Sequence, residues 1–286
     1  MAGVSTSVEQ DVRGALLNDV HERFVHEEFK GPFAKRTSAA NDGEPTGSAG
    51  NVNVMVGDRN SFEYHIIGTQ TILGPVKTSA GYNFAMDQDN NDGLEVTLGN
   101  EQPADTLISN VAGATRGTFV VGTDAPFYVA LKATVATIAG CDEFIVGFRK
   151  AEAYQAAIET GYDETAHLNV RSGDIYISTI LNGGSPTDTD TTDNWAAAET
   201  HTLMVVCDSD GTLSGDGTVG KCYYMIDGLK PTTEPTSRFK FDSGEIVIPF
   251  FAFRQDAALS GAMNVKLWES GLWPMGETSQ YQLGTP

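Results

Sequence analysis

The sequence has few cysteines, few basic residues and no long apolar run, and each shortage argues against a class of protein. Its three cysteines, Cys141, Cys207 and Cys222, leave one thiol over however they pair, which disfavours a disulfide-stabilised scaffold. None belongs to the Cys-x-x-Cys pairs that zinc ribbons and redox motifs use. We therefore expect three small buried thiols, with Cys207 and Cys222 as the one pair that a hairpin could bring face to face.

The shortage of basic residues argues against a nucleic-acid partner. Lysine and arginine total 18 against 38 aspartates and glutamates, so the formal net charge of the 286 residues is −20. A surface of this sign repels phosphate backbones. No stretch approaches the ~20 apolar residues of a membrane-spanning helix, and the opening MAGVSTSVEQDV lacks the basic and apolar regions of a secretory signal. We accordingly expect no membrane partner.

The first fifty residues differ from everything that follows. A four-residue apolar repeat after Ser7 predicts an amphipathic helix over about residues 8–30. The repeat overshoots the helical period, so the stripe winds around the helix, which is marginal alone. A linker rich in Gly, Ser and Pro follows over 31–51. Two interpretations stay open: the helix packs on its own domain, or residues 1–50 form an arm that binds a neighbouring subunit. The apolar residues of the repeat are Val8, Val12, Leu16, Val20 and Phe24.

From about residue 51 the sequence is a succession of short β-type runs separated by turn residues. Many of them alternate apolar and polar side chains, as half-buried strands do. The one helical-looking piece is Lys150–Glu159, a short Ala/Glu-rich insertion. The pattern predicts one large antiparallel sandwich over 51–286. The expected strands are Asn51–Val56, Phe62–Ile67, Asn83–Met86, Leu94–Leu98, Gly117–Val121, Phe127–Thr137, Glu143–Arg149, His167–Val170, Ile175–Leu181, His201–Cys207, Lys221–Ile226, Glu245–Phe253 and Asn264–Trp268.

Two features of the C-terminal half predict how its strands pack. Asp227-Gly228 predicts a two-residue hairpin turn, because both residues tolerate the left-handed backbone that such a turn needs. Trp195 and Trp268 are large enough to fill a gap between two sheets. The side chains expected to alternate inward from the paired strands are Met204, Val206, Tyr224 and Ile226.

These segments resemble concanavalin A-like (laminin-G-like) jelly rolls. The resemblance covers about 120–286 well and 51–119 loosely, and it implies an all-β antiparallel sandwich. Because this fold carries lectins, glycosidases, lyases and structural modules, it does not imply a function. The segments that carry it are Trp195, His201–Val206, Tyr223–Gly228, Phe239–Asp242, Ile248–Phe251, Asn264–Glu269 and Glu143–Arg149.

The sequence offers little that indicates catalysis. Glucanases of this fold carry Glu-x-Asp-x-x-Glu on one strand, so that two carboxylates flank the sugar bond. The nearest approach, Glu9-Gln10-Asp11 followed by Val-Arg-Gly, lacks the last glutamate and lies in the predicted helix. His167 and His201 could meet within the sandwich, although histidines with satisfied hydrogen bonds in the core are the favoured interpretation. We therefore predict that the protein is not an enzyme and expect no cofactor.

Acidic loops leave one open alternative, calcium. Asp87, Asp89 and Asn91 place oxygens at alternate positions, as a calcium loop does, but its glycine falls one place late and its twelfth position is Leu98. Two further clusters occur, and plain turn residues are the favoured interpretation of all three. The further clusters are Asp188, Asp190 and Asp193, and Asp208, Asp210 and Asp216.

Three functions remain, of which a structural virion protein accounts for most features. Such a capsid decoration or cement subunit of a tailed phage would be made in the host cytoplasm and anchored by residues 1–50. Its partners would be the major capsid protein or other virion subunits, and we expect it to form dimers or trimers. The alternatives are a glycan-binding, lectin-like module of a phage appendage and, less favoured, a polysaccharide-degrading enzyme.

Overall fold

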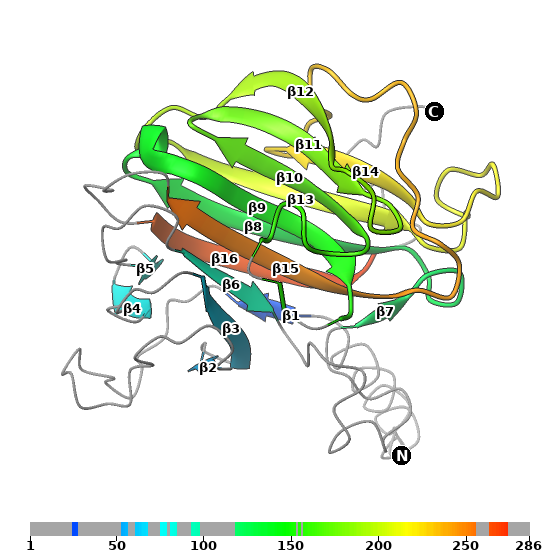
Figure 1. Cartoon of the computed structure of the whole chain (residues 1–286), viewed down its shortest axis with the longest axis horizontal. Coiled ribbons are helices and arrows are strands. Elements are labelled where there is room, and N and C mark those ends of the chain that lie inside the picture. Colours follow the sequence, from blue (N-terminus) through cyan, green and yellow to red (C-terminus); the bar gives the residue numbers. More distant parts are fainter. Residues whose placement is uncertain are drawn as a thin grey trace, which may run out of the picture.

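The described residues of this computed structural model form two antiparallel sheets that pack face to face (Figure 1). The prediction of an all-β sandwich is confirmed. Apart from one turn of 3-10 helix, η1 (Ile138–Gly140), no helix occurs in the part of the chain that the structure describes, and so none there could cross a membrane. The structure describes residues 25–27, 53–56, 61–67, 75–78, 81–84, 93–97, 118–152, 154–155, 157–255 and 263–273.

The seven-stranded sheet runs β14-β13-β8-β16-β5-β4, and β1 also pairs with β16. Its central strands, β8 and β16, pair over most of their length and lie side by side in Figure 1. The strands of this sheet are β1 (Val25–Glu27), β4 (Pro75–Thr78), β5 (Gly81–Phe84), β8 (Phe127–Val135), β13 (Thr200–Asp208), β14 (Lys221–Ile226) and β16 (Met263–Leu272).

The nine-stranded sheet runs β12-β11-β10-β9-β15-β6-β3-β2, and β7 also pairs with β15. Strands β9 to β12 follow one another both along the chain and across the sheet, so residues close in sequence lie side by side on its outer face. The strands are β2 (Asn53–Val56), β3 (Ser61–Ile67), β6 (Gly93–Thr97), β7 (Phe119–Val120), β9 (Cys141–Lys150), β10 (Thr165–Arg171), β11 (Asp174–Ile180), β12 (Thr187–Asn194) and β15 (Ile246–Gln255).

The main core lies between the sheets. Alternate side chains of both sheets enter it, as the period of two requires. Trp195 and Trp268 are both buried there, as predicted, and Trp195 packs edge-on against Phe144 with ring centroids 5.5 Å apart. The three cysteines are free and buried, and Cys207 lies directly opposite Cys222 in the β13–β14 pair. Burial raises the pKa of the Cys141 and Cys207 thiols.

The β13–β14 pair confirms one prediction and corrects another. Asp227 and Gly228 both have positive φ and close a tight turn between Ile226 and Leu229. Met204 and Val206, predicted to face inward with Tyr224, instead belong to a separate apolar cluster away from the main core. Alternation could not decide between the faces, because both faces of these strands carry apolar side chains.

Two predicted helices are corrected in the described residues. Val25–Glu27, inside the predicted helix, forms strand β1 paired with Ser270 to Trp268 of β16. Lys150 ends strand β9, and the described residues of 151–159 contain no helix. Instead, the buried side chain of Ile158 and the partly buried Tyr154 pack against the nine-stranded sheet. The rest of the predicted arm, including Val8, Val12, Leu16, Val20 and Phe24, lies outside the described residues.

Candidate binding site on the outer face of the nine-stranded sheet

Part of this outer face is covered by the described residues of 151–164, which we call the strap. Ile158 and Tyr162 of the strap pack on Ile145 and Phe250 of the sheet, with Tyr154 beside them. This apolar contact buries the outer face of β9 and β15.

A buried ion pair lies beneath the strap. The Arg149 Nε donates to Glu95 Oε1 at 2.7 Å, and both side chains are fully buried. The Tyr162 hydroxyl donates to the other oxygen of Glu95 at 2.5 Å, and the Arg149 guanidinium lies 4.4 Å from the Tyr162 ring centroid. Breaking one member of such a pair leaves a buried charge uncompensated, so the trio fixes the strap in place.

Another part of the face, over β9–β12, is polar. We call this surface the polar patch. Its members on β9, β10 and β11 alternate with core residues and so point away from the main core, and Asp188 on β12 lies opposite Ser178 of β11. The polar patch consists of Glu143, Thr165, His167, Asn169, Arg171, Ser178 and Asp188.

Strand register aligns part of the polar patch in one row. His167 lies opposite Gly147 on β9 and opposite Ser178 on β11, and Ser178 lies opposite Asp188 on β12. Gly147 has no room for a side chain: an added Cβ would lie 2.3 Å from the Ala166 carbonyl oxygen. The row therefore requires glycine beside the His167 imidazole.

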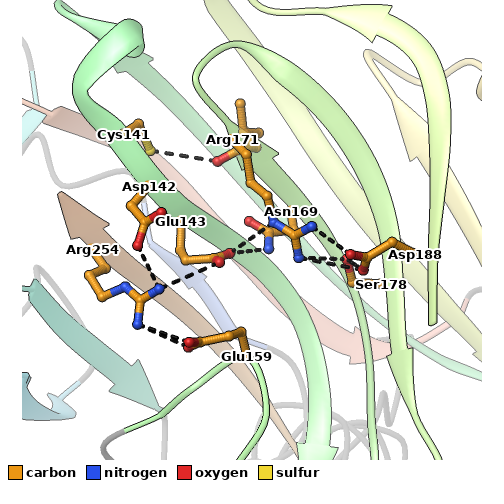
Figure 2. Close-up of polar contacts among 10 residues, drawn as sticks. Cys141, Asp142, Glu143, Glu159, Asn169, Arg171, Ser178, Asp188 and Arg254 are labelled. Atoms are coloured by element: carbon orange, nitrogen blue, oxygen red, sulfur yellow. Dashed lines mark hydrogen bonds and ion pairs between the residues drawn. The ribbon is translucent and has the colours of Figure 1, made fainter. Parts of the chain in front are cut away.

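Arg171 holds the polar patch together. Its Nη1 donates to Asp188 Oδ2 at 2.6 Å, and its Nε donates to Glu143 Oε2 at 3.5 Å on the other side (Figure 2). Ser178 Oγ donates to Asp188 Oδ1 at 2.6 Å, and the Asn169 amide nitrogen donates to Glu143. The guanidinium also lies over the Tyr176 ring, 5.1 Å from its centroid. Figure 2 shows this guanidinium between its two carboxylates.

The charges of the polar patch shift one another's pKa values. Burial raises the pKa of Glu143, and Arg171, Asn169 and Arg254 only partly offset this effect. Burial also acts to raise the pKa of Asp188, but the bonds from Arg171 and Ser178 outweigh burial and lower it. Burial acts to lower the pKa of Arg171, but the carboxylates of Asp188 and Glu143 outweigh burial and raise it.

A second arginine joins the polar patch to the strap. Arg254 Nη1 donates to both Glu159 oxygens at 3.0 and 3.1 Å, and Nη2 lies 2.5 Å from Asp142 Oδ2 and 3.7 Å from Glu143 Oε1 (Figure 2). Glu143 thus stands between two guanidinium groups.

Three successive residues on the outer face of β10 are buried and carry side-chain atoms without a hydrogen-bond partner. Thr165 Oγ1, both nitrogens of His167 and Asn169 Oδ1 have no hydrogen-bond partner. All three residues are almost fully buried, with at most 1% of their surface exposed. Burial, followed by the charge of Arg171, lowers the pKa of His167 to about 3, so its imidazole is neutral near pH 7. Buried polar atoms normally find partners, so a line of unpaired ones points to a ligand or ordered water.

The sequence-predicted sites have different outcomes. The residues Asp87, Asp89 and Asn91 lie outside the described residues, and calcium there stays a prediction. Among the described residues no group of three or more acidic, His or Cys side chains could hold a metal ion. The interpretation of the two other clusters as plain turn residues is corrected in part. Asp188, Asp190 and Asp193 lie on strand β12, and Asp208 is buried at the end of β13, where it accepts from the Leu213 and Ser214 amides of the following turn.

The two histidines do not meet. His167 lies on β10 and His201 on β13, which belong to different sheets. His201 Nδ1 contacts Asp227 Oδ2 at 2.6 Å and is satisfied as expected, whereas both His167 nitrogens lack partners. The polar patch could not be predicted from the sequence, because its contacts depend on strand order and because Asp188 lies on β12, whose alternating threonine and aspartate carry no apolar signal. The β-branched threonines of that strand were the one available clue.

Comparison with known proteins finds similarity in structure alone. No family model matches the chain, and no curated protein is similar to it in sequence. The Emp47p carbohydrate recognition domain aligns with 88% of this chain and 96% of its own, at 10% identity and a TM-score of 0.47. The Ca²⁺-bound VIP36 exoplasmic/lumenal domain aligns with 92% and 95%, at 8% identity and 0.45. The carbohydrate binding module CBM66 of Bacillus subtilis aligns with 69% and 94%, at 11% identity and 0.38.

The fold is an antiparallel β-sandwich of two sheets. At these identities and TM-scores, the likeness assigns neither a family nor a ligand to this chain. The carbohydrate and calcium in the names of those domains are properties of those proteins. What this chain binds has to be argued from its own side chains.

Proposed function

We propose that the protein is a carbohydrate-binding module and that the polar patch is its binding surface. The observation that carries this proposal is the line of buried, unpaired hydrogen-bonding atoms on β10, at Thr165, His167 and Asn169. Beside it lie the half-buried Arg171 and the more exposed Asp188. Sugar hydroxyls both donate and accept hydrogen bonds, so one sugar ring can satisfy neighbouring atoms of either kind.

The arrangement suits binding better than hydrolysis. A retaining glycosidase places the sugar bond between two carboxylates about 5 Å apart, one of them with a raised pKa. Glu143 and Asp188 have pKa shifts in opposite directions, but the guanidinium of Arg171 occupies the space between them. The Arg171 guanidinium is hydrogen-bonded to a carboxylate on each side, so a glycosidic bond has no room between the two carboxylates. The protein is therefore proposed to be non-catalytic.

The test is binding of the full chain to an array of oligosaccharides, compared with an Arg171→Met variant. We expect at least one oligosaccharide to bind, and the variant to lose about tenfold or more in affinity, because Glu143 and Asp188 lose their shared partner. Arg238→Met is the matched control: Arg238 contacts Glu234 and the Tyr223 ring, on the other sheet. Equal losses in both variants, or no binding by wild type, would contradict the proposal, and release of reducing ends would show an enzyme.

The virion role predicted from the sequence stays a prediction. It depends on the arm of residues 1–50, of which the structure describes 25–27 alone. A capsid partner, self-association and a virion location therefore remain expectations, to be tested by deleting residues 1–50 and measuring whether particles still take up the protein.

A further inference from the structure

The guanidinium of Arg171 has little capacity left for another anion. Nη1 and Nη2 both donate to the Asp188 carboxylate, at 2.6 and 3.4 Å, and Nε faces Glu143 at 3.5 Å. Nη2 also lies 3.5 Å from Ser178 Oγ. Each nitrogen of this group already has an acceptor within the protein.

The second cation near the polar patch is occupied in the same way. Arg254 contacts both oxygens of Glu159 and lies within ion-pair distance of Asp142 and Glu143. Two guanidinium groups thus face four carboxylates, those of Asp142, Glu143, Glu159 and Asp188. Acid groups exceed cations here, as they do in the whole chain, whose formal net charge is −20.

The atoms without partners are, by contrast, neutral. Thr165 offers a hydroxyl and Asn169 an amide oxygen. His167 is neutral because burial and Arg171 lower its pKa. The capacity for new hydrogen bonds therefore lies with uncharged groups, while the charged groups are already paired.

We propose, on the basis of the carbohydrate-binding function above, that the polar patch selects neutral sugars and rejects acidic ones. A uronate ligand would bring its carboxylate toward Asp188 and Glu143 and would have to displace one of them from Arg171. A neutral sugar meets no such competition. Asp188 sets this selectivity, because its more exposed carboxylate accepts hydrogen bonds from both Nη1 and Nη2 of Arg171.

The experiment replaces Asp188 and asks whether acidic sugars are admitted. Asp188→Asn removes one of the two carboxylates on Arg171 while it keeps the side-chain size. Titration calorimetry measures binding of the full chain to three hexasaccharide probes: neutral glucose, neutral mannose and acidic galacturonate. Asp193→Asn is the matched control, because it removes the same charge from the same strand, where Asp193 bonds Thr232 and not Arg171.

Wild type is expected to bind a neutral probe about tenfold or more tightly than the galacturonate probe. The Asp188→Asn variant is expected to gain about tenfold in galacturonate affinity, and Asp193→Asn to gain little. The inference is overturned if wild type binds the galacturonate probe as tightly as a neutral one, or if both variants gain equally. Failure of wild type to bind any probe would overturn the proposed function itself, and this inference with it.

Discussion

At the scale of single residues, the most unusual group outside the polar patch is Glu164. It precedes Thr165 at the end of the strap and is fully buried. Burial raises its pKa to about 7 and the charges of Glu245 and Asp242 add to this effect, while a hydrogen bond from the Asp242 backbone and the charge of Lys150 act to lower it. The protein therefore holds a carboxylate that is half protonated near neutral pH.

Replacing Glu164 is expected to change how stability depends on pH. Because the folded pKa of about 7 exceeds the ordinary 4.5, the contribution of Glu164 to stability is complete below pH 4.5 and is lost as the pH rises through 7. Urea unfolding at pH 5 and pH 8 should show this decline in wild type and not in Glu164→Gln. Equal declines in the two proteins would place the pKa of Glu164 near its ordinary value.

Gly147 is a second residue whose replacement has a definite expectation. The Cβ of Gly147→Ala would lie 2.5 Å from His167 Cα as well as against the Ala166 carbonyl, so β9 and β10 would have to separate. We expect a loss of about 2–4 kcal/mol in the free energy of unfolding. Gly215→Ala is the comparison: it has open space but a φ of +70°, and should lose about 1 kcal/mol. A smaller loss at Gly147 than at Gly215 would contradict the steric argument.

At the scale of elements, the strap depends on a few buried contacts. The Tyr162 hydroxyl donates to Glu95 of the sheet and accepts from the Gln155 amide at 3.3 Å. It therefore bonds the strap to the sheet and also links two residues within the strap. The strap has no regular secondary structure of its own in its described residues, so these contacts take the place of a helix or strand ladder.

Tyr162→Phe is expected to lower the free energy of unfolding by about 1–2 kcal/mol, because the buried Glu95 loses a donor. Amide hydrogen exchange should become faster in the strap and change little in β13 and β14. Tyr224→Phe is the control: its hydroxyl is buried without a partner, so its removal should be neutral or stabilising. If Tyr224→Phe destabilised the protein more, the Tyr162–Glu95 bond would not be what holds the strap.

Sequence patterns predicted the strands better than the polar patch. Each of the thirteen expected runs overlaps a strand, because β-branched and aromatic residues alternate there. Three described strands were missed: β12, because its side chains are threonine and aspartate; β1, because it falls inside the segment predicted to be helical; and the short β4. The pairing of Arg171 with Glu143 and Asp188 depends on strand order, which no local pattern contains.

At the scale of the whole molecule, the excess of acid sets the response to salt. With a formal net charge of −20, repulsion among carboxylates opposes the compact state more than the ion pairs favour it. Raising NaCl from low to physiological concentration should therefore increase Tm by a few degrees. Calorimetry at fixed pH measures this, with sucrose at matched osmolarity as the control. A Tm that falls with salt would show that screened ion pairs, such as Arg171–Asp188, outweigh the repulsion.

The position of β12 has a consequence for how the protein behaves when concentrated. It is the last strand on its side of the nine-stranded sheet, where an uncovered strand could recruit another chain into a growing fibre. Aspartates 188, 190 and 193 give that border a negative charge, and the Thr233 amide caps the Thr191 carbonyl. The aspartate that pairs with Arg171 thus also helps to prevent aggregation, so variants that lack it should be more prone to amyloid-like assembly.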